Sequence, residues 1–213
     1  MCGSMTACGW LWATISIAAA GAACTSFYWA DWVHGQTRLP YSVGQNATFR
    51  FGLFRRCNYI QVNQSSTSLN QEVTLRTECG RYQNFDDIPS VYWQTSTVLF
   101  GVAAGLLVLV ALTAFFALFL EDVCNKTLSR AAGVLQGVAA LSMAVTLFLY
   151  PVGWDAESVK DEACGPDAGS YKPGSCSIGV AFYIGIGATA VAMLATVMSP
   201  LSQRKKTRSD YVI

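Results

Sequence analysis

Four long stretches of the chain contain no charged residue. They cover Met1–Ala30, Ile88–Leu120, Ala131–Trp154 and Pro173–Gln203. A helix needs roughly 20 apolar residues to cross the hydrocarbon core of a bilayer, and each stretch is long enough to supply them. The pattern predicts a single membrane domain over residues 1–200. Its transmembrane helices are expected at residues 7–29, 94–120, 131–150 and 177–198.

A signal peptide is the alternative for the first stretch. Signal peptides begin with a basic segment and carry an apolar run of about 7–15 residues. This stretch has no basic start, and its apolar part, Ala7–Trp29, is longer than such a run. These features favour a retained helix.

Two polar loops, at residues 30–93 and 151–176, separate the helices on one side, and a tail follows at 201–213. In the first loop, Ala47–Val62 and Glu72–Tyr82 alternate apolar and polar residues on either side of a polar turn, residues 63–70. A period of two predicts a pair of β-strands. In the second loop, Asp155 is placed to cap a short helix over residues 156–163.

Basic residues are concentrated on the opposite side of the predicted membrane domain. Those in the tail and in the turn between the second and third helices are Arg204, Lys205, Lys206, Arg208, Lys126 and Arg130. The loop at 151–176 contains only Lys160 and Lys172. Short segments rich in Lys and Arg stay in the cytoplasm. We therefore expect a multi-pass protein of the plasma membrane with both termini cytoplasmic and both loops extracellular.

The two loops contain an even number of cysteines. Cys57 and Cys79 lie in the first loop, and Cys164 and Cys176 lie in the second. Even numbers on an oxidising side indicate disulfides, and closing either loop would remove on the order of 3 kcal/mol of unfolded-state freedom. Pairing within each loop is the simplest arrangement, and pairing between the loops is compatible with the sequence. A zinc site is the rival interpretation, but the single histidine, His34, has no Cys-x-x-Cys partner.

Three sites are candidates for covalent modification. Asn46 and Asn63 begin Asn-x-Ser/Thr sequons in the first loop, where glycosylation is expected. Asn125 begins a third sequon, but it falls in the predicted cytoplasmic turn. Cys124 in the same turn is a candidate for palmitoylation, and an inert thiol is the alternative.

Small residues recur along the predicted helices. They are Ala18 and Ala22, Gly101 and Gly105, Gly133 and Gly137, and Gly185 and Gly187. In lipid, small residues let helix backbones approach closely. Packing within one bundle is the simpler interpretation, and contact with a second copy or a partner is the other. Gln136, the most polar residue deep in the third helix, is expected to bond to a neighbouring helix.

The composition favours contact over catalysis. Charged residues make up 13% of the chain, against about a quarter in a typical soluble domain. No predicted membrane helix contains an acid, a histidine or an arginine, the usual marks of ion and proton paths. No base and nucleophile pair up for catalysis, and no basic stripe suggests nucleic acid. We expect no enzyme activity, no cofactor and no metal. The acidic residues of the second loop lack the spacing of a calcium loop.

Several segments in order resemble a known family. Trp32 followed by Gly52-Leu53-Phe54 and then Cys57 resembles the first-loop signature of the claudin and peripheral-myelin-protein superfamily. Two departures, Phe54 in place of tryptophan and a late Cys79, fit one branch, the lipoma HMGIC fusion partner-like tetraspan family. Segments 51–59, 78–82, 150–155 and 171–176 also resemble that branch. The motif residues are Trp32, Gly52, Leu53, Phe54, Arg56, Pro151, Gly153 and Trp154.

The resemblance implies a fold and a role. The fold is an all-α, left-handed, claudin-like membrane bundle of four helices with a small extracellular antiparallel sheet. Members serve as auxiliary subunits of membrane receptor, adhesion or channel complexes, so a larger membrane protein is the expected partner. A claudin-like junction or barrier protein is the second hypothesis, and a small channel or transporter is the third.

The tail suggests a further partner. The chain ends in Tyr211, Val212 and Ile213, with apolar or aromatic residues at the last position and two before it. Such an end suits a peptide added as a strand in the groove of a PDZ domain. The sequence therefore predicts a PDZ scaffold as a second partner.

Overall fold

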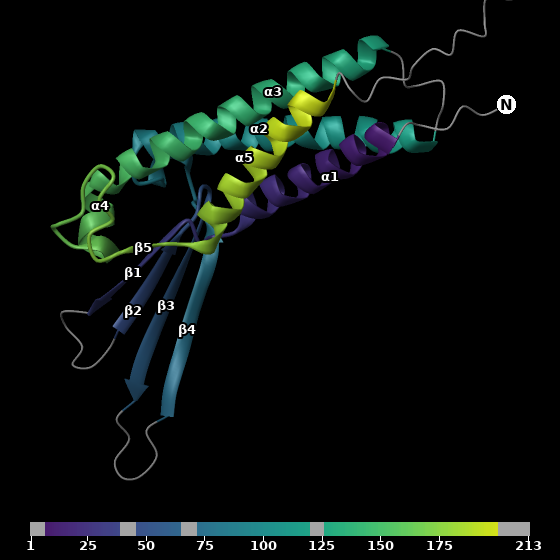
Figure 1. Ribbon diagram of the computed structural model, residues 1–213. Coiled ribbons are helices and arrows are strands. Elements are labelled where there is room, and N and C mark those ends of the chain that lie inside the picture. The colour runs from purple at the N-terminus through teal and green to yellow at the C-terminus, as the bar shows by residue number, and fades with distance from the viewer. Residues whose placement is uncertain (1–6, 39–45, 65–71, 120–125, 200–213) are drawn as a thin grey trace, which may run out of the picture.

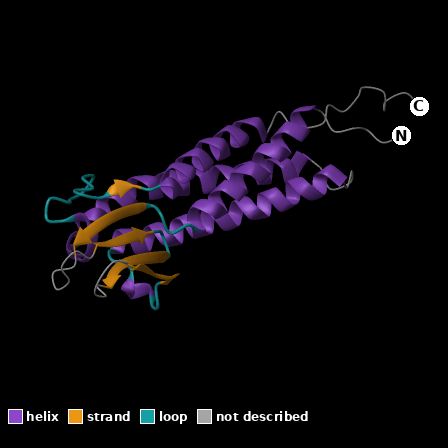
Figure 2. Cartoon of the chain, turned by 90° about the horizontal axis from the view of Figure 1, so that it is seen from below, coloured by secondary structure: helices purple, strands orange, loops and turns teal. Residues whose placement is uncertain are grey.

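The computed structural model describes residues 7–38, 46–64, 72–119 and 126–199. Within them, four long helices form a bundle: α1 (Ala7–Tyr28), α2 (Val91–Phe119), α3 (Lys126–Leu149) and α5 (Val180–Met198). Each contains a span long and apolar enough to cross a membrane. The strands extend from one end of this bundle (Figure 1). The start of α1 and the end of α5 lie at the opposite end (Figure 2). We call these the sheet end and the terminal end.

The helix bounds differ from the predicted ones for local reasons. Helix α2 begins at Val91, not 94, because the Oγ of Ser90 accepts a hydrogen bond from a backbone N–H of the first turn (3.1 Å). Helix α3 begins at Lys126, not 131, because a hydropathy pattern leaves out charged residues that the helix includes. Helix α5 begins at Val180, not 177, because residues 177–178 belong to the sheet.

The sheet has five antiparallel strands in the order β4-β3-β2-β1-β5. The strands are β1 (Val33–Arg38), β2 (Asn46–Phe51), β3 (Arg55–Gln64), β4 (Glu72–Arg81) and β5 (Ser177–Ile178). The first four come from the first loop, and β5 comes from the second. The sheet therefore joins the two loops into one unit.

The single strand predicted over Ala47–Val62 is wrong, because the structure divides it into β2 and β3. A turn separates them, closed by a hydrogen bond from the Gly52 N–H to the Arg55 carbonyl (2.8 Å). A Cβ on Gly52 would lie 2.8 Å from the Cα of Ala30, so only glycine allows this approach to the end of α1. Strand β1 was not predicted from alternation of apolar and polar residues, because Val33 is its only large apolar residue.

Both disulfides form within loops. Cys57 and Cys79 are directly opposite in β3 and β4, with an S–S distance of 2.05 Å. Cys164 and Cys176 close the second loop, with an S–S distance of 1.94 Å. Pairing within each loop is thus confirmed, and pairing between the loops is excluded.

The second loop folds into short helical turns. They are η3 (Tyr150–Asp155), α4 (Glu157–Val159) and a π-helical turn, η4 (Lys160–Cys164). The predicted cap is wrong, because Ala156 precedes α4 and no side chain caps it. Asp155 instead accepts a hydrogen bond from the Nζ of Lys160 (2.6 Å). A lysine one turn away offers the carboxylate a full positive charge, which competes with the partial charges of backbone N–H groups.

Five of the eight predicted small residues pack inside the bundle, among them Ala22, which packs against the main core cluster. A Cβ on Gly101 would lie 3.1 Å from the ring of Phe27, which brings α1 and α2 together. One on Gly137 would lie 3.2 Å from Thr196, between α3 and α5, and Gly133 faces α5 in the same way. Gly185 approaches α1 at Ser26, described below.

Three other small residues face outward. Ala18, Gly105 and Gly187 are exposed, and a Cβ on either glycine would meet nothing within 4 Å. Packing within the bundle is therefore wrong for these three. Spacing by four marks one side of a helix, but it does not say whether that side faces a neighbouring helix or the lipid.

Candidate functional site

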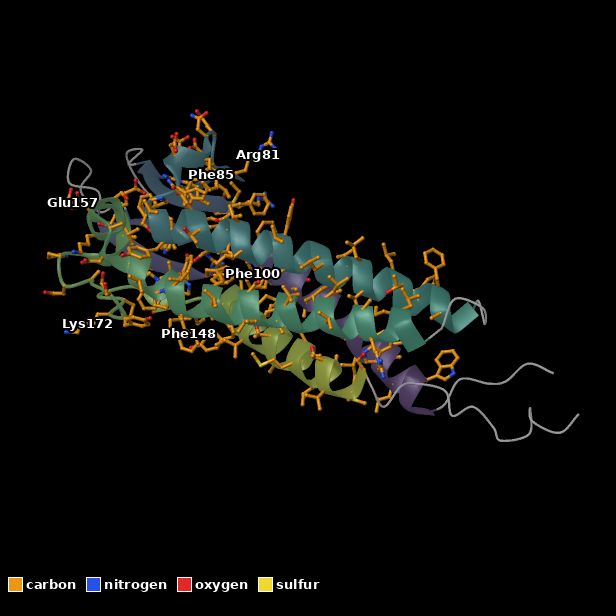
Figure 3. All side chains as sticks on the ribbon, turned by 90° about the horizontal axis from the view of Figure 1, so that it is seen from above. Arg81, Phe85, Phe100, Phe148, Glu157 and Lys172 are labelled. Atoms are coloured by element: carbon orange, nitrogen blue, oxygen red, sulfur yellow. A yellow bond between two sulfur atoms is a disulfide. The ribbon has the colours of Figure 1, made fainter. Side chains whose placement is uncertain are left out.

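Six large aromatic residues gather where the bundle joins the sheet. They are Trp32, Phe51, Trp93, Phe100, Tyr150 and Phe182. Trp93 stacks on Tyr150 with 4.6 Å between ring centroids. Trp32 packs edge-on against Phe100 and Phe182, at 5.3 Å from each. We call this set the aromatic junction. Phe100 lies inside the bundle, while Arg81 on β4 points away from the chain (Figure 3).

Hydrogen bonds orient the junction. The Trp32 indole N–H donates to the Ser26 carbonyl (2.8 Å), and the Trp93 indole N–H donates to the Tyr150 carbonyl (2.9 Å). The Thr97 hydroxyl of α2 donates to the Leu53 carbonyl in the turn between β2 and β3 (2.6 Å). Large rings with a satisfied polar tip are well suited to a site that is buried and yet must be directional.

Asp31 ties the end of α1 to the start of α5. Its backbone carbonyl accepts a hydrogen bond from the Ala181 N–H (3.0 Å), and its carboxylate accepts one from the Val180 N–H (3.2 Å). Both donors belong to the first turn of α5, where a negative charge is also favoured by the helix dipole. The same carboxylate lies 2.9 Å from the Nδ1 of His34. One buried acid thus satisfies two otherwise unpaired helix donors.

The segment after α3 packs tightly on the start of α2. A Cβ on Gly153 would lie 2.5 Å from the Trp93 indole nitrogen and 2.6 Å from the Ser90 Oγ. Trp154 is buried beside it, as is Pro151. Any side chain at residue 153 would displace the indole from the aromatic junction.

The two loops also contact each other directly. The Nη2 of Arg56 in β3 lies 3.5 Å from the Oε2 of Glu162 in the second loop. Gly35 of β1 faces the second disulfide, because a Cβ there would lie 2.5 Å from the Cys176 sulfur. Burial raises the pKa of the neighbouring Tyr82 phenol far above its ordinary value, so this group is neutral and exchanges no proton near neutral pH.

The described residues hold no group of three metal-ligating side chains. Three carboxylates at the sheet end have structural partners: Asp31 contacts α5 and His34, Glu162 contacts Arg56, and Asp155 contacts Lys160. This arrangement can hold a sheet in a fixed position above four helices. Its chemistry is that of a rigid presenting surface.

Comparison with known proteins identifies the family. The model of the lipoma HMGIC fusion partner-like protein family matches residues 8–204. The chain belongs to this family. Human LHFPL tetraspan subfamily member 2 protein is 33% identical over all of this chain and 94% of its own length, and the zebrafish member 2a protein is 30% identical over the same shares. Mouse member 4 is 31% identical over 69% of this chain and 56% of its own length.

Membership makes this chain a multi-pass tetraspan protein of the bilayer. The described helices and the small sheet agree with the tetraspan, claudin-like fold of the family. Phe54, which stands where the wider superfamily signature has tryptophan, stacks on Phe27 of α1 with centroids 4.8 Å apart. Of the other first-loop motif residues, Trp32 belongs to the aromatic junction, Gly52 and Leu53 lie in the turn beside it, and Arg56 belongs to β3.

The remaining predicted sites are placed as follows. Asn46 begins β2 and Asn63 lies near the end of β3, but neither side chain is described. Cys124 and the terminal residues 211–213 lie outside the described residues. Gln136 donates to the Ser16 hydroxyl of α1 (3.2 Å), as predicted for an amide in lipid.

Sequence reasoning missed Asp31. It is an isolated acid that follows directly on a long charge-free helix and stands between Trp29 and Trp32. A charge at such a position is costly unless it is paired, and that cost was the available signal.

Proposed function

We propose that this chain is a non-enzymatic auxiliary or organising subunit of a larger membrane receptor, adhesion or channel complex. It would act at the plasma membrane with both termini in the cytoplasm. The basic tail and the basic turn before α3 support this orientation. The sheet would then be extracellular, presented on a base that two disulfides and the aromatic junction hold rigid.

The observation that carries the proposal is Gly187, exposed in the middle of α5. A helical glycine costs about 1 kcal/mol relative to alanine, and none of the described residues comes within 4 Å of a Cβ built on it. Tyr183, Ala190 and Leu194 continue the same exposed face. In lipid, a small residue on an outer face lets a second helix approach closely. A transmembrane helix of the partner would occupy this face.

Purification from native membrane tests the proposal. Tagged wild-type chain in mild detergent should bring down one larger membrane protein in constant proportion, and Gly187→Leu should lose it. Gly105→Leu on α2 is the matched comparison, because that glycine is equally exposed with open space beside it, and loss of the partner in this variant alone would place the docking face on α2. Constant partner yield in Gly187→Leu would contradict docking on α5.

The C-terminal residues Tyr211, Val212 and Ile213 would separately engage a PDZ scaffold. Appending one alanine should abolish capture of the chain by such a domain, because the groove holds the terminal carboxylate. Capture that survives the extra alanine would exclude this mode of binding. The partner of the membrane domain should stay bound in the same variant.

A claudin-like junction role is the second candidate, favoured by one feature. Strand β4 is an edge of the sheet, and its exposed residues 77–81 could pair with another copy. Expression in an epithelial layer distinguishes the two candidate functions. Continuous intramembrane particle strands in freeze-fracture images, together with a raised transepithelial resistance, would support the junction role. An auxiliary subunit should leave the resistance unchanged.

A further inference from the structure

Two hollows meet on the outer face of α1. The first, about 530 Å³, lies beside the sheet and is lined by residues of α1, β2 and β3, among them Tyr28, Arg50 and Arg55. The second, about 310 Å³, is an apolar groove between α1 and α2. Cys24 lines both hollows, so they adjoin at this residue and together form a depression along α1. We call the first part the arginine hollow and the second the apolar groove.

The arginine hollow lies where a bilayer has its headgroups. The apolar span of α1 ends at Tyr28. Tyr28 and Trp29 both line the hollow and are 61% and 48% exposed. Amphipathic aromatic rings at the end of a membrane helix mark the headgroup layer. The guanidinium groups of Arg50 and Arg55 therefore stand at the depth of lipid phosphates.

The charge of the arginine hollow is positive and accessible. Among the described residues, an Asp31 carboxylate oxygen lies 3.9 Å from the Arg50 Nη1, and the Arg50 guanidinium lies 5.3 Å from the centroid of the Tyr59 ring. Arg55 lies over the Tyr28 ring at 4.4 Å. Guanidinium groups are planar donors that suit a phosphate, and the Arg50 side chain is 40% exposed, so its outer N–H groups are accessible to a ligand.

The apolar groove and the arginine hollow together extend along α1 over about the depth of one leaflet. The α1 side of the groove follows Ile17, Ala20, Gly21 and Cys24, one face of the helix that leads up to Tyr28. From residue 17 to residue 28 a helix rises about 16 Å, close to half of the roughly 30 Å hydrocarbon core. Gly21 keeps the groove open, because a Cβ there would meet nothing within 4 Å.

We propose that this depression binds one glycerophospholipid of the adjacent leaflet, with its phosphate held by Arg50 and Arg55 and one acyl chain in the apolar groove between α1 and α2. Charge complementarity selects the phosphate, and the two hollows adjoin at Cys24, where headgroup and chain would meet. The site is distinct from the α5 face of the proposed function and does not depend on it.

Native mass spectrometry of the full-length chain in mild detergent tests the site with phosphatidylglycerol as the probe. One tightly bound lipid per chain is expected. Arg50→Gln and Arg55→Gln should each weaken binding about tenfold, the effect of losing one charge-assisted hydrogen bond. Arg81→Gln is the matched control, because Arg81 is an exposed arginine of the same sheet that does not line the hollow. Equal binding by wild type and an Arg50→Gln/Arg55→Gln double variant would overturn the proposal.

The acyl groove has its own pair of variants. Gly21→Phe should fill the groove and weaken binding at least tenfold, while Leu141→Phe, which places a ring on the exposed side of α3, should leave it unchanged. Equal effects of the two substitutions would overturn the groove assignment. Because a Cβ at residue 21 would meet nothing within 4 Å and Leu141 is 65% exposed, both variants should keep the wild-type elution volume and helix content. Arg55→Lys, which keeps the charge, should retain more binding than Arg55→Gln.

Two compounds that each contain only part of the lipid distinguish the contribution of the phosphate from that of the acyl chains. Diacylglycerol has the chains without the phosphate, and glycerol 3-phosphate has the phosphate without the chains. Neither should displace phosphatidylglycerol at equal concentration. Displacement by diacylglycerol would contradict headgroup selection, and displacement by glycerol 3-phosphate would contradict a lipid as the occupant. Copurification of a partner helix that excludes the lipid from the groove would also overturn the proposal.

Discussion

The two ends of the bundle are held together by different kinds of contact. At the sheet end, large rings interlock and their N–H groups donate to named carbonyls, while Asp31 caps α5. Toward the terminal end, the core is built mostly from alanine. That cluster consists of Trp12, Ala13, Val110, Ala114, Ala132 and Ala195. Between the two ends, Gln136 and Ser16 form a hydrogen bond across helices.

The comparison shows that fixing the angle of the helices and bringing the helices close together depend on different contacts. Small side chains let helices approach in lipid, where no hydrophobic force drives them together, but they do not fix an angle or a rotation. Rings and hydrogen bonds do fix them, because each has a preferred geometry. The sheet end therefore determines how the sheet stands on the bundle, and the terminal end keeps the helices close.

Removing a ring from the aromatic junction should have the largest effect. Trp93→Ala loses the stack on Tyr150 and the indole hydrogen bond, and should cost about 3–5 kcal/mol of unfolding free energy. Trp10→Ala is the control, because Trp10 is 50% exposed on the outside of α1. Thermal unfolding in detergent measures both. Similar losses from the two substitutions would contradict the difference between the two ends.

The two disulfides, which both lie at the sheet end, should differ because one is buried more deeply than the other. Replacing either pair with alanine should cost about 2–5 kcal/mol. The cost should be larger for Cys164 and Cys176, which are 1% and 6% exposed and lie against β1, than for Cys57 and Cys79, where Cys79 is exposed. Unfolding midpoints of the two double variants give the order. The reverse order would indicate that loop closure alone, and not burial, sets the effect.

A single hydrogen bond distinguishes two buried tryptophans. Trp32→Phe should cost about 1–3 kcal/mol, because the Ser26 carbonyl loses the indole donor. Trp12→Phe at the terminal end should cost less, because the Trp12 indole nitrogen has no hydrogen-bond partner among the described residues. Denaturation of the two variants in the same detergent compares them directly. A larger loss for Trp12→Phe would show that ring volume outweighs the bond.

The smallest effect is expected between the ends. Gln136→Leu removes the bond to Ser16 but also removes a buried amide oxygen that lacks a partner. Interhelical hydrogen bonds in membranes contribute about 0.6 kcal/mol on average, so stability should change by less than about 1 kcal/mol. The same unfolding assay applies, with Gln136→Asn as the polar control. A loss of several kcal/mol would mean that this amide positions α3 after all.

The local sequence pattern was sufficient to predict an element when a single property, such as charge or hydrophobicity, defines that element. The absence of charge predicted the four helices, alternation predicted strands around Cys57 and Cys79, and the even number of cysteines in each loop predicted the disulfides. The local pattern did not predict the bounds of an element when those bounds depend on contact with a distant segment. The break at Gly52 exists because the end of α1 lies against it, and β5 exists because β1 offers an edge to residues 177–178.

The sequence by itself determined that this chain is a tetraspan membrane protein of a known family, because hydropathy, cysteine number and motifs are properties of the linear chain. Only the tertiary structure decided which small residues face lipid and where Asp31 finds its partners. It also decided that Arg50 and Arg55 line the arginine hollow beside α1. Those facts depend on the rotation of each helix and on contacts between residues far apart in sequence, which no local pattern records.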